Sequence, residues 1–114
     1  MATIKSYTSL PQAEILSKIL PFESADMCYP LPCVNNDKPL LENGGFGSTP
    51  CWSLATLLDA INKDYYTTLY HDGVAWNIEV IHHDDVKDKH HTYAGTQVDA
   101  CVEMIIKLHE QKLL

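Results

Sequence analysis

The chain contains no arginine, so its 8 basic residues are all lysines, and these are scattered along the sequence. Arginine is the side chain best suited to bidentate binding of phosphate and carboxylate groups. The chain also carries 15 acidic residues and a formal net charge of −7. Because a nucleic-acid backbone rewards clustered Lys and Arg, this composition argues against a nucleic-acid-binding protein.

The sequence also lacks a long apolar run and an apolar segment near its N-terminus. We therefore expect neither a membrane span nor a signal peptide, and we expect a cytoplasmic protein. The 4 cysteines include no Cys-x-x-Cys pair. In a cytoplasmic protein we expect them to be reduced, with a Cys28–Cys33 disulfide as the alternative.

No catalytic motif is present in the 114 residues, and we expect a non-enzymatic protein without a cofactor. Residues 44–49, Gly-Gly-Phe-Gly-Ser-Thr, lack the Gly-Lys-Ser/Thr ending of a phosphate loop, so a flexible linker is the preferred interpretation. Cys51 precedes a predicted helix, and a helix N-terminus can lower a thiol pKa. The preferred interpretation of Cys51 is nevertheless a buried structural thiol.

Three helices are indicated by capping residues and apolar spacing. Ser9 and Gln12 form a capping box for a helix over residues 9–20, which Pro21 ends. Ser53 caps a second helix over residues 53–62. Thr96 caps a final helix, whose residues from Val98 onward keep the i, i+3, i+4 spacing of one apolar face.

Residues 65–81 predict a β-hairpin. A two-residue type I′ turn at Asp72-Gly73 would pair Leu69 with Trp76 and Tyr65 with Val80. Because side chains alternate along a strand, one face is apolar and should be buried, and the other should face solvent. The apolar face comprises Tyr65, Thr67, Leu69, Trp76, Ile78 and Val80. The solvent face comprises Tyr66, Thr68, Tyr70, Ala75, Asn77 and Glu79.

Residues 90–94 predict a short third strand, which completes a small antiparallel sheet. We therefore predict a single α+β domain, 1–114, with helices packed on one face of the sheet. Trp76 should be buried against the last helix. Residues 21–50 should form a long irregular loop pinned to the core, with a short strand or turn near residues 29–34.

Four histidines near the end of the hairpin raise the question of a metal site. His82, His83, His90 and His91 lie near several aspartates, and imidazole and carboxylate groups both bind zinc. Adjacent strand residues point to opposite faces, however, so each pair offers one ligand per side. The preferred interpretation is a polar loop without a native metal.

Tyr66 and Tyr70 on the solvent face are candidate partner-binding residues, together with Tyr29 and Phe46 in the long loop. Tyrosine offers amphipathic contact area and is enriched at interfaces. The alternative is that tyrosine is simply a good strand residue. The free edge of the strand at residues 65–71 also invites pairing between two chains, so a homodimer is a further option.

Three stretches carry a resemblance. They are residues 19–27 (Ile-Leu-Pro-Phe-Glu-Ser-Ala-Asp-Met), residues 50–55 (Pro-Cys-Trp-Ser-Leu-Ala) and residues 98–105 (Val-Asp-Ala-Cys-Val-Glu-Met-Ile). Together they resemble a family of short proteins of unknown function encoded by gut anaerobic bacteria and their phages or mobile elements. The family has Asn-Pro where Thr96-Gln97 stand here. The resemblance implies a bacterial cytoplasm and a phage or prophage origin, and it supplies no functional residues.

The leading hypothesis is a protein-interaction or regulatory accessory protein, because an acidic chain without arginine or catalytic motifs suits protein binding better than catalysis. The alternative is a small-molecule- or metal-binding protein with a pocket between the sheet and the middle loop.

Overall fold

The computed structural model describes residues 5–29 and 49–114. Their order is α1 (Leu10–Leu16), the 3-10 turn η1 (Phe22–Ser24), β1 (Met27–Tyr29), β2 (Thr49–Cys51), α2 (Leu54–Asn62), β3 (Tyr65–His71), β4 (Trp76–His82), β5 (Lys89–Ala94) and α3 (Gln97–Glu110). Strands β3, β4 and β5 form one antiparallel sheet in that order, and β1 and β2 form a second. The predicted α+β class is confirmed.

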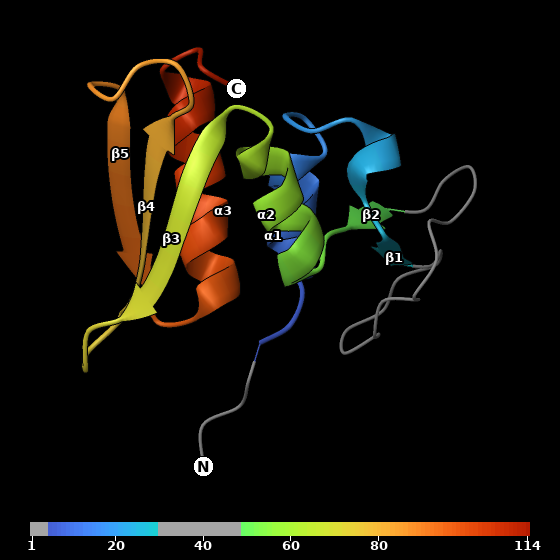
Figure 1. Ribbon diagram of the computed structural model, residues 1–114. Helices are drawn as coiled ribbons and strands as arrows, with labels where there is room; N and C mark the ends of the chain where they lie inside the picture. Colours follow the sequence, from blue (N-terminus) through green and yellow to red (C-terminus); the bar gives the residue numbers. More distant parts are fainter. Residues whose placement is uncertain (1–4, 30–48) are drawn as a thin grey trace.

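The helices lie between the two sheets. Figure 1 shows the three-stranded sheet on one side, α2 and α3 against it, and the β1–β2 pair at the other end of the molecule. Helix α3 packs on β4 and β5, α2 packs on β3 and α3, and α1 packs on β2 and α3. One face of the three-stranded sheet is therefore covered by helices, and we call the opposite face the outer face.

The three predicted helix caps are confirmed. Ser9 and Gln12 form the capping box of α1, and the side chains of Ser53 and Thr96 accept the N–H groups of Thr56 and Asp99. Helix α1 ends at Leu16 rather than at residue 20. Beyond it the two patterns mix: Ile19 N bonds three residues back, to Leu16 O at 2.9 Å, and Leu20 N bonds four residues back, to the same oxygen at 2.8 Å.

The start of α1 is joined to the start of α3 by polar side chains. Lys5 Nζ donates to Asp99 Oδ1 at 2.6 Å and to Gln12 Oε1 at 2.8 Å. Gln12 Nε2 also donates to Asp99 Oδ1 at 2.7 Å. The third helical positions of two helices and the N-terminal segment therefore share one hydrogen-bond network.

The hairpin register differs from the predicted one by two residues. Leu69 pairs with Ile78, and His71 pairs with Trp76, so residues 72–75 form a four-residue connection. A shift of two residues keeps every side chain on its predicted face. Trp76 lies at the end of the sheet, so its expected full burial is wrong: the indole is half-buried, packed against the core and beside the His71 ring.

The described parts of the segment expected to be an irregular loop include two short strands. Strand β1 pairs with β2, so Met27 lies opposite Cys51 and Tyr29 opposite Thr49. Tyr29 is only 5% exposed, and its hydroxyl donates to the Thr8 carbonyl oxygen at 2.7 Å. Its position is that of a core residue and not of the partner-binding residue that we predicted. The predicted site residue Phe46 lies outside the described residues.

Candidate functional site

The outer face is a grid of three rows that cross β3, β4 and β5. The register places Tyr66 beside Ile81 and Lys89 in the first row, Thr68 beside Glu79 and His91 in the second, and Tyr70 beside Asn77 and Tyr93 in the third. Since the helices pack on the opposite face, these nine side chains are the surface that the sheet offers to a partner.

Large apolar and aromatic side chains are exposed on this grid. Tyr66 is 67% exposed, Tyr93 68%, Tyr70 38% and Ile81 36%. The Tyr66 ring packs against the His83 ring with centroids 4.4 Å apart, and the Tyr70 hydroxyl donates to Glu79 Oε1 at 3.4 Å. Tyr66 and Tyr70 therefore contact neighbouring side chains and still expose much of their own surface.

Asn77 is the buried polar residue of the grid, at 5% exposure. Its Nδ2 donates to Asp72 Oδ2 at 3.0 Å and to the Ala75 carbonyl at 3.1 Å. Its Oδ1 lies 2.8 Å from His91 Nε2. Because both amide protons are used by oxygen acceptors, Oδ1 must accept, so the His91 Nε2 atom carries the proton.

The Asp72 carboxylate fixes the hairpin connection next to the grid. Oδ1 accepts the N–H groups of Val74 and Ala75, both at 2.8 Å. These two backbone donors and the Asn77 amide lower the pKa of Asp72 to about 2, since they stabilise the charged form. Asp72 therefore stays ionised, and the connection between β3 and β4 keeps one shape.

The four histidines proposed as weak metal ligands are separated by the sheet. His90 lies on the helix side, where its Nε2 is 2.6 Å from Asp88 Oδ1, and His91 lies on the outer face. His82 packs edge-on against the Tyr65 ring, and His83 packs on Tyr66. Within residues 5–29 and 49–114, no group of three or more His, Cys, Asp or Glu side chains is placed to hold a metal ion.

Asp88 connects this histidine region to the core. Its Oδ2 accepts the Tyr65 hydroxyl at 3.1 Å while its Oδ1 contacts His90. Burial, followed by the hydrogen bond and the charge of Asp88, raises the pKa of Tyr65 to about 12. This arrangement pins the connection between β4 and β5 to the sheet, which is a structural role for residues that looked like metal ligands.

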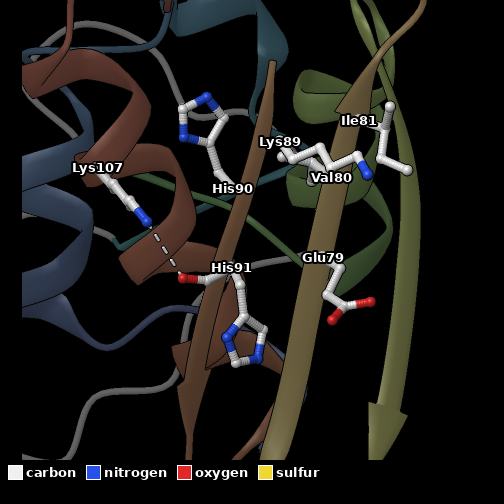
Figure 2. Close-up of a pocket in the computed structure, with 7 residues that line it drawn as sticks. All are labelled: Glu79, Val80, Ile81, Lys89, His90, His91 and Lys107. Carbon is white, nitrogen blue, oxygen red and sulfur yellow. Dashed lines mark hydrogen bonds between the residues drawn. The ribbon is translucent and has the colours of Figure 1, made fainter. Parts of the chain in front are cut away.

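An open depression of about 330 Å³ lies at the β5 edge of the sheet. Figure 2 shows the side chains that line it. It is lined by Glu79, Val80, Ile81, Lys89, His90, His91 and Lys107. Lys107 reaches from α3 to donate to the His91 carbonyl at 3.3 Å. The pocket that we predicted between the sheet and the middle loop involves residues 30–48, which lie outside the described part.

The cysteines do not provide a nucleophile in the described part of the chain. Cys28, Cys51 and Cys101 are free and buried. Burial raises the pKa of the Cys51 thiol, although hydrogen bonds to Thr8 and Tyr29 oppose this. Burial also raises the pKa of Cys101 to about 12. Cys51 is therefore a structural thiol, and its place near a helix N-terminus does not activate it.

Comparison of the chain with protein-family models, with curated proteins and with solved structures gave no match. Among the described residues, no helix combines the length and the apolar character needed to cross a bilayer. The candidate site therefore depends on geometry alone. Of the predicted partner-binding residues, Tyr66 and Tyr70 lie on the outer face, while Ile81, His91 and Tyr93 join them without having been predicted.

Proposed function

We propose that this chain is a non-enzymatic protein-binding module whose partner docks on the outer face. The observation that carries the proposal is the exposure of Tyr66, Tyr70, Ile81 and Tyr93 on a face of the sheet that none of the described helices covers. Aromatic side chains bury large areas and lose few rotamers on binding, so they serve as anchors at protein interfaces. Thr68, Glu79 and His91 lie between them and supply polar contacts.

The partner proposed is a protein and not a nucleic acid. The whole chain carries a net charge of −7, which repels a phosphate backbone. In line with the resemblance to bacterial and phage proteins, we propose a regulatory or accessory role in a bacterial cytoplasm. The alternative of a small-molecule- or metal-binding protein has less support, because Lys107 already donates to the His91 carbonyl in the depression at the β5 edge.

The test is site-specific photo-crosslinking in the cells that encode the chain. A photoreactive phenylalanine analogue replaces Tyr66 in one variant, Tyr93 in a second and Val86 in a control. Val86 is 70% exposed and lies in the connection between β4 and β5. We expect positions 66 and 93 to give an adduct with the same protein and position 86 to give none.

Loss of binding provides the second measurement. Y66S/Y93S should abolish binding of the protein identified by crosslinking, whereas V74S/V86S should retain it, because Val74 is 90% exposed and also lies outside the grid. Both double variants should keep the circular dichroism spectrum and melting temperature of the parent. Equal crosslinking from all three positions, or binding that survives Y66S/Y93S, would overturn the proposal.

A further inference from the structure

The two edges of the three-stranded sheet differ in their protection. At β5, the edge carries Lys89, His90 and His91, and Lys107 Nζ donates to the outward carbonyl of His91. Lysine charges and blocked backbone groups are devices that prevent edge-to-edge pairing of strands. Strand β3 reads Tyr-Tyr-Thr-Thr-Leu-Tyr-His, with no Lys, Asp, Glu or Pro. The β3 edge therefore lacks the protection that the β5 edge has.

The hydrogen-bond pattern defines which groups the β3 edge presents. Asp72 N donates to Ala75 O at 3.2 Å, and His83 N donates to Asp64 O at 2.9 Å. In an antiparallel pair these bonds recur at every second residue, so even-numbered residues of β3 bond to β4. The odd-numbered ones, Thr67, Leu69 and His71, direct N–H and C=O groups outward.

The outward groups of these three residues are available for pairing. Within the described chain, none of them has a backbone or side-chain partner. His71 is exposed, and Thr67 and Leu69 are half-buried. Tyr65 also directs its backbone outward, but it is only 1% exposed and cannot be reached. The usable edge therefore runs from residue 67 to residue 71.

We infer that this edge pairs with β3 of a second copy of the chain, in antiparallel orientation about a two-fold axis. Leu69 lies opposite Leu69 of the second copy, and Thr67 lies opposite His71. Each of these pairs exchanges both of its N–H···O bonds, so every accessible outward group is used. The interface is isologous, as in most homodimers, and it joins the two sheets into one.

Charge disfavours one of the two neighbouring registers. Moving the second copy by two residues to bring Tyr65 opposite His71 would place Asp64 opposite Asp72 of the second copy. Like charges directly opposite destabilise a strand pair, and Tyr65 is inaccessible in any case. In the register centred on Leu69, Asp72 instead faces Tyr66 of the second copy, and Tyr65 falls at the Gly73 turn, outside the ladder.

The dimer uses the edge of the sheet and not the outer face. Loss of the dimer would therefore leave partner binding on the outer face possible, and loss of partner binding would leave the dimer possible. Pairing at β3 would bring Tyr66 and Tyr70 of both copies onto one continuous face. A heterologous extended peptide could also pair with this edge. The second copy is favoured because the segment is uncharged and complementary to itself about the two-fold axis.

The test uses charges at positions 67 and 71, which face each other only between copies. T67K/H71K and T67E/H71E each place like charges opposite one another in the dimer. We expect the parent chain to sediment as a dimer at high concentration, and each variant alone to weaken the dimer about tenfold or more. An equimolar mixture of the two variants should restore dimerisation as a mixed dimer, which native mass spectrometry identifies by mass.

Lys89→Glu at the other edge is the matched control and should leave the dimer unchanged. Melting curves of all variants report whether each one folds, and a mixed dimer that forms from two folded variants excludes a purely structural effect. A parent chain that stays monomeric at high concentration overturns the inference. The inference is also overturned if T67K/H71K and T67E/H71E dimerise as strongly as the parent chain, or if their equimolar mixture remains monomeric.

Discussion

Asn77 Nδ2 lies 3.0 Å from Asp72 Oδ2, which connects the buried polar residue of the outer face to the hairpin connection. The other oxygen of the same carboxylate accepts the N–H groups of Val74 and Ala75. These bonds stabilise a four-residue connection and therefore set the register of β3 on β4. They also explain why a polar side chain can be buried between Tyr70 and Tyr93.

Asn77→Asp should destabilise the fold by about 1–3 kcal/mol at neutral pH, because a second carboxylate would face Asp72 in place of an amide donor. Chemical denaturation measures the change. D72N/N77D swaps the two groups and restores one amide–carboxylate contact, so the double variant should recover a clear part of the loss. Simple additivity of the two single variants would contradict this coupling.

The Asp72 carboxylate should also give the fold a defined acid sensitivity. Its pKa in the folded chain is about 2, below the ordinary value of 3.8. A depressed carboxyl pKa contributes stability that is complete above the unfolded value and is lost as pH falls through the folded value. The difference in unfolding free energy between the parent and Asp72→Asn should be constant above about pH 5 and should shrink from about pH 4 to about pH 2. A difference that persists unchanged at pH 2 would show that the charge is not the cause.

The two tryptophans should differ in their contribution to stability. Trp52 is 0% exposed, and its Nε1 donates to Ser24 Oγ at 2.9 Å, so Trp52→Ala should cost about 3–5 kcal/mol. Trp76 is half-buried, so Trp76→Ala should cost roughly 1–2 kcal/mol. Urea titrations of both variants give the comparison. An equal or larger loss for Trp76 would contradict the hairpin register.

The buried thiols should resist alkylation until the chain unfolds. Cys28, Cys51 and Cys101 are 1%, 0% and 0% exposed, and burial raises the pKa of Cys101 to about 12. The thiolate is the reactive form, so burial opposes the reaction at all three thiols, and the raised pKa opposes it further at Cys51 and Cys101. In a Cys33→Ser variant, iodoacetamide labelling at pH 8 should be slow in buffer and fast in denaturant. Rapid labelling of Cys51 in the folded state would contradict its structural role and make it a candidate nucleophile.

Removal of metal ions should leave the melting temperature unchanged. The contacts of the histidines are already explained by Asp88, Asn77 and the rings of Tyr65 and Tyr66. A structural metal would contribute folding free energy, and EDTA would then lower the melting temperature clearly. The control is the same measurement after dialysis against zinc, which should not raise the melting temperature of the EDTA-treated chain.

Local signals in the sequence were sufficient to predict where the helices start and which side chains share each face of the hairpin. Ser9, Ser53 and Thr96 cap helices through contacts within three residues, so short motifs identify them. The hairpin faces follow from strict alternation, which survives a register shift of two. The shift itself could not be predicted, because it depends on how the Asp72 carboxylate binds two backbone donors.

Other features depend on contacts that no local pattern encodes. Strands β1 and β2 have three residues each and lie far apart in the sequence, so they carry no usable periodicity. Tyr93 and His91 could be assigned to one face of a third strand by alternation. Their place in the grid depends on the β4–β5 register, which the Asp88 contacts help to fix, and so the outer face was only half predicted.

The network of Lys5, Gln12 and Asp99 has a consequence for how the chain is made. Lys5 and Asp99 are 94 positions apart, yet their side chains meet at the starts of two helices. During synthesis the ribosome releases the N-terminal segment long before α3, so α1 must wait for almost the whole chain before this anchor can form. A nascent chain stalled before residue 97 would therefore hold its first helix by the capping box and the packing of α1 on β2, without the anchor to α3, and this part of the chain would be more open to chaperones and proteases.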